Sequence, residues 1–294
     1  MNWKKRVARL YLAALMGSLL PGCGKAQVVE KEEVVDDSFT QYNVIANSGG
    51  KIGEYTLTNS IEALDASYEK GIRLFDVDFL FTADDVLILR HDWDQTDFGQ
   101  KKVASLLGQE YEKDAYGESV IDSSLLPKYL TLQKQKVYGK FDTYTVEDLA
   151  DWMADHKDAY ILCDARQETI YAYQTIYDVC NQKDPELLKQ IVVLCNNEEE
   201  LENILGVYSF ENILVRKSEG NAISYNDMIK MHRKYNVRGA ILNTDQQNEF
   251  SVNRLRSNGM KIYWNQVDDV ESYLENFGQD GVVSDTLGEN KPAE

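Results

Sequence analysis

The chain has 294 residues, of which 43% are hydrophobic and 27% are charged, and its net charge is −18 at pH 7. A chain of this length can bury a large core, and its apolar content excludes an intrinsically disordered protein. Because a strongly acidic surface repels nucleic acid and anionic lipid, we expect no nucleic-acid partner.

The first 22 residues have the pattern of an export signal. Four basic side chains in the first nine residues precede the apolar run Leu10–Leu20, which is too short to span a bilayer comfortably. The following LPGC resembles the processing site of a bacterial lipoprotein, which implies that Cys23 becomes the lipidated first residue. We therefore expect an exported protein anchored to the cell membrane or envelope. A plain signal peptide and an uncleaved anchor are the alternatives.

The remaining chain is expected to hold one folded domain. Residues 23–40 are mostly polar and acidic, which predicts a flexible tether. The domain is expected over residues 41–288, and residues 289–294 form a short tail. Its three cysteines have no CxxC spacing, so we expect buried, unpaired thiols, although one disulfide stays open as an alternative. These cysteines are Cys163, Cys180 and Cys195.

From Gln41 onward, short β-rich apolar runs alternate with helix-like segments. The strand candidates are Tyr42–Ala46, Ile72–Phe79, Ala159–Cys163, Gln190–Cys195, Asn212–Val215, Gly239–Leu242, Lys261–Trp264 and Gly281–Val283. The helix candidates are Ser60–Lys70, Val146–His156, Glu168–Asn181, Glu198–Val207, Ser224–Tyr235 and Asn248–Asn258. Thr58 or Asn59 is expected to cap the first of these helices, and Thr145 the second.

Eight strand candidates that alternate with helices predict an α/β fold, a (β/α)8 TIM barrel. An open, doubly wound sheet is the alternative. Residues 94–144 are too many for an ordinary loop, so they predict an insertion after the second strand, near the mouth of the barrel.

Functional residues of a βα barrel collect at the carboxyl ends of its strands. Polar residues follow most strand candidates there: Asn47, Asp164, Asn196, Arg216, Asn243, Asp245, Asn265 and Asp285. The second strand candidate itself contains two acids, Asp76 and Asp78, which point to the same face because they are two positions apart.

Two carboxylates on one strand face repel each other unless a cation or a proton compensates them. Asp164 on the next strand would complete a set of three hard oxygen ligands for Mg²⁺ or Ca²⁺, with Asp76 and Asp78 as the other two. The alternative is that these acids bond to backbone groups at the rim, or pair with Arg73 and Arg166.

His91 follows the short apolar run after the two acids, and Asp92 comes next. A histidine beside a metal could protonate or deprotonate an oxygen of a phosphodiester. A packing or capping role is the alternative. The other two histidines, His156 and His232, lie in helix-like segments and are expected at the surface.

The order of these motifs resembles the glycerophosphodiester phosphodiesterase family. The chain shows IANSGG, TNSIEAL, FDVDFLFTADD and LRHDW in series, and its GQDGVVSDTL resembles the closing Gly-x-Asp-Gly-x-x-Thr-Asp of that family. The stretch YTVEDLADWMADHKDAYILCDAR is similar to the family's branch of phosphatidylinositol-phospholipase-C-like bacterial surface proteins. The resemblance extends from Tyr42 to about Leu287.

The resemblance implies a TIM barrel that hydrolyses glycerophosphodiesters with a divalent cation, either Ca²⁺ or Mg²⁺. The metal ligands of the family fall on Asp76, Asp78 and Asp164, and Asp76 replaces a glutamate. His91 falls on one catalytic histidine of the family. The basic neighbour of the third ligand, usually lysine, falls on Arg166, which with Arg216 would bind the phosphate.

The second histidine of the family falls on Asn47, which cannot exchange a proton near neutral pH. We therefore expect hydrolysis at a reduced rate. The alternative is a catalytically silent exported protein that binds a phosphorylated polyol or a fragment of the cell envelope. A glycosidase-like barrel is a third possibility, but Asp76 and Asp78 share one strand and lie too close to flank a glycosidic bond. The head group of the substrate is not specified by the sequence.

Overall fold

We describe the protein from a computed structural model. It describes residues 38–82, 85–91, 137–138, 140–165, 168–218, 223–246, 248–269, 273, 275–276 and 278–286, all of which belong to one compact unit, 36–294. The predicted export signal and lipidation site, Arg166 and most of the predicted insertion lie outside these residues.

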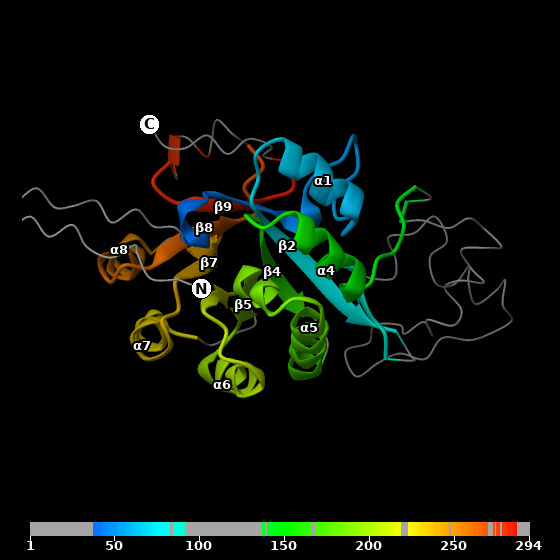
Figure 1. Ribbon diagram of the computed structural model, residues 1–294. Coiled ribbons are helices and arrows are strands. Elements are labelled where there is room, and N and C mark those ends of the chain that lie inside the picture. The colour runs from blue at the N-terminus through cyan, green and yellow to red at the C-terminus, as the bar shows by residue number, and fades with distance from the viewer. Residues whose placement is uncertain are drawn as a thin grey trace, which may run out of the picture. The chain divides into compact units, whose positions relative to one another are not determined.

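Eight parallel strands close into a barrel, as the alternation of apolar runs predicts (Figure 1). They are β1 (Val44–Ala46), β2 (Leu74–Phe81), β4 (Tyr160–Ala165), β5 (Ile191–Cys195), β6 (Asn212–Lys217), β7 (Gly239–Asn243), β8 (Lys261–Asn265) and β9 (Gly281–Ser284). Each pairs with the next along the chain, and β1 pairs with both β2 and β9. This double pairing closes the barrel and excludes the open sheet.

A ninth strand, β3 (Leu87–Leu89), folds back on β2 in the antiparallel direction. It brings the chain from the far end of β2 back toward the barrel mouth, where His91 follows it. The predicted insertion therefore begins after β3 and not directly after β2. Within the end of the insertion, Val137 bridges to Phe141, and the chain then rejoins β3 through a bridge from Thr145 to Ile88.

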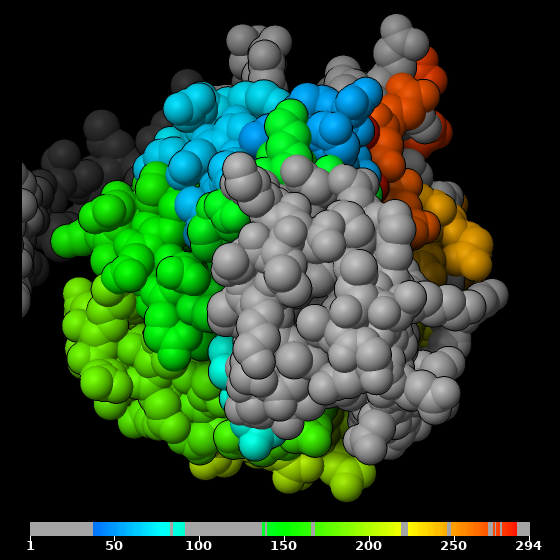
Figure 2. Space-filling model, turned by 90° about the vertical axis from the view of Figure 1, so that its right-hand side faces the viewer, coloured from blue at the N-terminus to red at the C-terminus, as the bar shows by residue number. Residues whose placement is uncertain are grey.

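All six predicted helices are present and pack around the barrel (Figure 1). They are α1 (Ile61–Glu69), α4 (Val146–Asp155), α5 (Thr169–Lys183), α6 (Glu198–Val207), α7 (Tyr225–Tyr235) and α8 (Glu249–Ser257). No helix among the residues that the structure describes is long and apolar enough to cross a membrane. Figure 2 shows α1, in blue to cyan, beside the green α4. Tyr68 of α1 makes an edge contact with the ring of Trp152 of α4, and Trp152 Nε1 donates a hydrogen bond to Asp65 Oδ1 of α1.

The helix caps follow the prediction at α4 but not at α1. Thr145 and Asp148 form a complete capping box at the start of α4. At α1 the cap is Ser60, whose hydroxyl accepts a hydrogen bond from the backbone N–H of Ala63, so the predicted cap at Thr58 or Asn59 is wrong. Asn59 instead contacts a carboxylate inside the barrel.

Side chains of the strands alternate between two apolar layers. The inner layer fills the barrel and the outer layer packs against the helices. The inner residues are Ile45, Leu74, Leu162, Val192, Leu194, Leu214, Ile241, Tyr263 and Val283. Because Leu74 points inward, Asp76 and Asp78 point inward too, two and four positions further along β2.

The folded domain begins earlier than the sequence predicts. Ser38 caps a short 3-10 helix over Phe39–Gln41, and Phe39 is fully buried among the inner residues of the barrel. The predicted tether, which ended at residue 40, is therefore too long at its carboxyl end. Phe39 is the one aromatic residue of that acidic stretch, so burying its ring against Tyr160 outweighs the polarity of its neighbours.

The three cysteines of the domain are unpaired and buried, as predicted. Burial raises the pKa of the Cys180 thiol to about 12, and it raises the pKa values of Cys163 and Cys195 as well. Thiols in this state act as small apolar side chains.

Candidate active site

A cavity of about 190 Å³ opens at the carboxyl ends of the strands. It brings together five of the residues with a predicted role in the site, and each comes from a different part of the barrel rim. These residues are Asn47, Asp76, His91, Asp164 and Arg216. Polar groups from so many strands converge there because the carboxyl ends of parallel strands meet at one rim.

The three predicted metal ligands share the inner face of the barrel. Asp78 and Asp164 are direct neighbours in the register of β2 and β4, and Asp76 lies two residues earlier on β2. Their exposed fractions are only 7% for Asp76, 2% for Asp78 and 5% for Asp164. Three carboxylates this deeply buried require compensation by positive charge or by hydrogen-bond donors.

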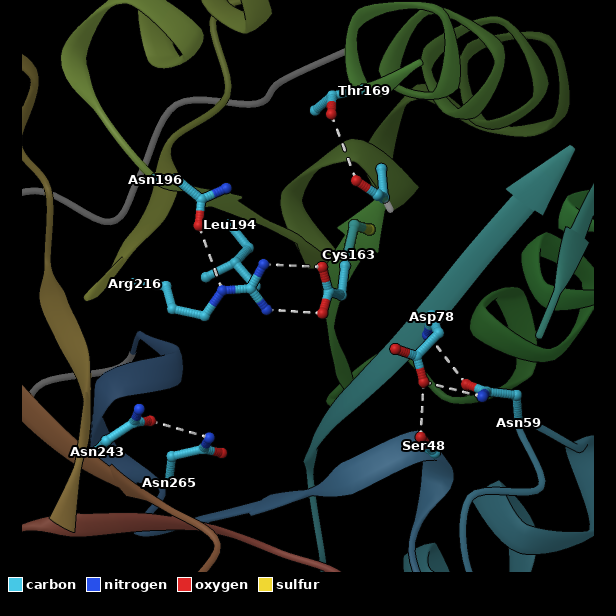
Figure 3. A network of polar contacts seen from close by, with 12 residues as sticks. Ser48, Asn59, Asp78, Cys163, Thr169, Leu194, Asn196, Arg216, Asn243 and Asn265 are labelled. Atoms are coloured by element: carbon cyan, nitrogen blue, oxygen red, sulfur yellow. Dashed lines mark hydrogen bonds and ion pairs between the residues drawn. The ribbon is translucent and has the colours of Figure 1, made fainter. Parts of the chain in front are cut away.

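Asp78 is compensated by hydrogen-bond donors from the segment before α1. Its Oδ2 accepts hydrogen bonds from Ser48 Oγ at 2.6 Å and from Asn59 Nδ2 at 2.9 Å. Asn59 Oδ1 in turn accepts from the backbone N–H of Asp78 at 2.9 Å. Figure 3 shows these contacts, with the second carboxylate oxygen pointing to the side on which Arg216 lies. These contacts hold Oδ2 and fix the orientation of the carboxylate.

Asp164 is compensated by a charge. Arg216 Nη1 lies 2.7 Å from Asp164 Oδ2, and Nη2 lies 3.2 Å from Oδ1, so the pair is bidentate (Figure 3). Arg216 Nε also donates to Asn196 Oδ1 at 3.3 Å.

Burial alone would lower the pKa of the Arg216 guanidinium. Asp164 raises that pKa through its charge and its hydrogen bonds, and the charges of Asp76 and Asp78 add to the effect, so the pKa rises overall. The sequence predicts Arg216 at this rim as a phosphate ligand. In this structure its guanidinium instead faces the carboxylates and serves as their positive charge.

The three acids suit a hard divalent cation by their chemistry, since Mg²⁺ and Ca²⁺ prefer carboxylate oxygens. Over the described part of the chain, however, no group of three or more His, Cys, Asp or Glu side chains lies close enough to hold a metal ion as placed. Arg216 occupies both oxygens of Asp164. A cation would therefore have to share Asp164 with this guanidinium or displace it.

His91 lines the cavity and lies two residues beyond β3. Its neighbour in sequence, Asp92, lies outside the described residues. The other histidines are away from the cavity and are half-buried rather than fully at the surface. His156 stacks on Trp152, and His232 Nδ1 contacts the carbonyl oxygen of Val237 at 2.8 Å.

Asn47 begins a tight turn after β1. Gly49 and Gly50 follow with φ values of +84° and +90°, which L-residues with side chains rarely adopt, so the glycine pair allows this turn. Asn47 Nδ2 donates a hydrogen bond of 2.7 Å to Asp285 Oδ1. The amide is thus oriented by a carboxylate that lies at the end of β9.

Two acids of the cavity received no role from the sequence, Asp285 and Asp268. Asp285 follows the last strand, which was the available signal. Asp268 Oδ1 accepts hydrogen bonds from Ser284 Oγ and from the backbone N–H of Asp285, both at 2.7 Å. Asp268 has no comparable signal, because it lies in an irregular segment three residues beyond β8.

The comparisons with known proteins agree with this fold. Residues 50–289 match the model of the glycerophosphoryl diester phosphodiesterase family. Among curated proteins, none matches the chain.

Solved structures of such enzymes share the fold at low sequence identity. A glycerophosphodiester phosphodiesterase from Thermotoga maritima is 18% identical, with a TM-score of 0.58 over 83% of this chain and 94% of that one. One from Parabacteroides distasonis is 17% identical, with a TM-score of 0.58 over 83% and 93%. A phosphodiesterase from Oleispira antarctica, in complex with the product sn-glycerol-3-phosphate, is 15% identical, with a TM-score of 0.60 over 83% and 92%. The chain belongs to the glycerophosphoryl diester phosphodiesterase family, a family of phosphoric diester hydrolases.

Proposed function

We propose that this protein hydrolyses glycerophosphodiesters or related head-group esters of phospholipids with the help of a divalent cation, Ca²⁺ or Mg²⁺. The observation that carries the proposal is the convergence of His91, Asp76, Asp164 and Arg216 on one cavity at the carboxyl end of the barrel. The product bound to the Oleispira antarctica phosphodiesterase, sn-glycerol-3-phosphate, supports this substrate class.

Asp76, Asp78 and Asp164 would hold the cation, because they are the hard oxygen donors of the inner face. When bound, a divalent cation polarises the phosphoryl group. The hydrogen bonds from Ser48 and Asn59 support this assignment, since they fix the Asp78 carboxylate in advance of any ligand.

His91 would protonate the leaving alkoxide, or activate the attacking hydroxyl, as the phosphorus–oxygen bond breaks. Arg216, and Arg166 outside the described residues, would stabilise negative charge on the phosphoryl oxygens. Asn47 would only position groups, because an amide exchanges no proton near neutral pH. The absence of one acid/base group typically lowers a rate by about 10²–10⁴-fold, so we expect slow turnover.

A catalytically silent binding protein is the second candidate. The bidentate Arg216–Asp164 pair favours it, because the site then carries its own positive charge in place of a cation. Such a cavity would bind a phosphorylated polyol or a fragment of the cell envelope without cleaving it. Asn47 favours this candidate as well.

Hydrolysis of glycerophosphodiesters by the purified protein, with and without Ca²⁺ or Mg²⁺, separates the two candidates. The His91→Ala and Asn47→His variants are measured beside the parent. Metal-dependent turnover that His91→Ala abolishes supports the hydrolase. A parent without turnover that Asn47→His activates supports the silent binder, with an intact but disarmed site.

We also propose that the protein is exported and anchored to the membrane through lipidated Cys23. The basic, apolar and LPGC order of the first 23 residues supports this. Cell fractionation tests it: the parent is expected in the membrane fraction, and Cys23→Ser in a fraction that washes free of membranes. Retention of Cys23→Ser on membranes would instead indicate an uncleaved anchor.

A further inference from the structure

The position of the second family histidine holds Asn47, so hydrolysis by this site needs another group to accept the proton of the attacking water. A titratable side chain can accept it, and the side chain that accepts the hydrogen bond from Asn47 is a carboxylate. Asn47 Nδ2 and Asp285 Oδ1 are 2.7 Å apart. Asp285 therefore lies beside the position at which the family histidine is replaced.

The fold places these two residues side by side. β1 and β9 are neighbouring parallel strands, and their last residues, Ala46 and Ser284, are register partners. The next residue on each strand is Asn47 on one and Asp285 on the other, both at the carboxyl ends. Both line the cavity together with His91.

The second oxygen of Asp285 is available to a ligand. Oδ1 accepts the hydrogen bond from Asn47, and the backbone N–H of the same residue donates to Asp268. No residue within the described part of the chain donates to Oδ2. The side chain is partly exposed and lines the cavity, so a water molecule there could donate to Oδ2.

The surroundings of Asp285 make it a stronger base than an ordinary aspartate. Burial raises its pKa, the hydrogen bond from Asn47 lowers it, the charge of Asp268 raises it, His91 lowers it and Asp78 raises it, and the sum is a raised pKa. A general base works best when its pKa lies nearer the working pH. The charges among these groups approach it from β2, from the end of β3 and from the segment after β8, and the Asn47 amide approaches it from the end of β1.

We propose that Asp285 is the second proton-transfer residue of this site, an inference that rests on the proposed hydrolysis. The oxygen of a water molecule forms a bond to phosphorus while its proton passes to Asp285 Oδ2. The bond from phosphorus to the leaving oxygen breaks, and the leaving alkoxide takes a proton from the His91 imidazolium. Asp285 then releases its proton to solvent as His91 regains one, so the step is a balanced hydrolysis.

The test is the pH dependence of kcat/KM for the parent and for Asp285→Asn. Asparagine keeps an oxygen that can accept the hydrogen bond from Asn47, so the substitution removes proton exchange and leaves the contact. We expect kcat/KM to fall by about 10²–10⁴-fold. The rise of activity with pH that reports deprotonation of Asp285 should disappear as well.

Two further variants control for structural effects. Asp245→Asn makes the same substitution at an exposed position in the 3-10 turn that follows β7, outside the cavity, and should match the parent. In an Asn47→His background, a histidine supplies a base at the same spot, so Asp285→Asn should cost much less there. Thermal melting of each variant shows that it is folded.

The outcomes test the role of Asp285 separately from the proposed hydrolysis. An active parent whose pH profile survives Asp285→Asn overturns the inference and leaves the hydrolase standing, with Asp285 only positioning Asn47. An inactive parent overturns both. An active parent that loses the rise with pH in Asp285→Asn, but keeps it in Asp245→Asn, supports both.

Discussion

The two sides of the cavity balance their charges differently. On the side of β2, β4 and β6, buried acids have fixed compensation, since Ser48 and Asn59 hold Asp78 and Arg216 pairs with Asp164. On the side of β1 and β9, Asp285 is held by hydrogen bonds instead, one from the Asn47 amide and one from its own backbone N–H to Asp268.

On this side, an amide donates a hydrogen bond to one acid, and a second acid lies nearby. Asn47 donates to Asp285, and Asp268 lies beside its backbone. Fixed compensation holds carboxylates in one orientation, which suits a ligand set for a cation. Burial and the charge of Asp268 raise the pKa of Asp285, which suits proton transfer. One cavity thus offers both kinds of chemistry, on neighbouring parts of the rim, since β1 pairs with β2.

The largest effect is expected at His91, which both sides of the cavity need for turnover. His91→Ala should lower kcat/KM for glycerophosphodiesters by about 10²–10⁴-fold, because it removes a proton donor. His232→Gln, whose histidine lies outside the cavity, serves as the matched control and should match the parent. Equal rates for His91→Ala and the parent would contradict the role of His91.

The next largest effect is expected when the positive charge that compensates Asp164 is removed. Arg216→Met leaves the Asp164 carboxylate without its bidentate partner. We expect the free energy of unfolding in the presence of a chelator to fall by about 3 kcal/mol, near the lower end for a buried pair because the guanidinium is 28% exposed. Denaturation by urea measures this loss.

The same variant tests the competition between the guanidinium and a cation. With Arg216 removed, Asp164 loses its ion-pair partner, so a bound cation gains more by compensating the acids. Ca²⁺ or Mg²⁺ should therefore raise the melting temperature of Arg216→Met more than that of the parent. Arg254→Met, at an exposed site on α8, should show neither effect. If the melting temperature of Arg216→Met does not change with Ca²⁺ or Mg²⁺, the acids hold no cation.

Most of the fold could be predicted from the sequence because it depends on local patterns. Each strand is an apolar run, and each helix begins near a capping residue such as Thr145. Phe39 was missed because it is a single buried ring in an acidic stretch, and only the closed barrel provides its pocket.

The candidate site was predictable as a set of residues but not as a set of contacts. The acids and His91 carry a recognisable spacing. The partners of Asp78 lie 19 and 30 residues away in the chain, and Arg216 lies 52 residues from Asp164. The local pattern predicted that Asn59 caps a helix. Its contact with Asp78 of β2 could not be predicted, because a contact between distant segments leaves no periodic signal in the sequence.

A smaller effect should follow when one donor to Asp78 is removed. Ser48→Ala deletes the hydroxyl that donates to Asp78 Oδ2 and leaves the donor from Asn59 in place. We expect the free energy of unfolding to fall by about 1.5 kcal/mol, as for a hydrogen bond to a charged group. Ser257→Ala, at the exposed end of α8, is the matched control. The same stability for both variants would mean that Asp78 needs only one donor.

The smallest effect, a shift of a pH profile, is expected on the side of β1 and β9. Asp268→Asn keeps an oxygen that can accept from Ser284 Oγ and from the backbone N–H of Asp285, but it removes a negative charge. That charge is one cause of the raised pKa of Asp285, so its removal should lower this pKa.

Because a base works only when deprotonated, the rise of kcat/KM with pH should then begin at lower pH in Asp268→Asn than in the parent. The pH profiles of both proteins, measured at fixed ionic strength, make the comparison. Asp245→Asn removes a charge of the same sign outside the cavity and should leave the profile in place. A rise that does not move to lower pH, while Asp285→Asn abolishes it, would mean that the charge of Asp268 does not raise the pKa of Asp285.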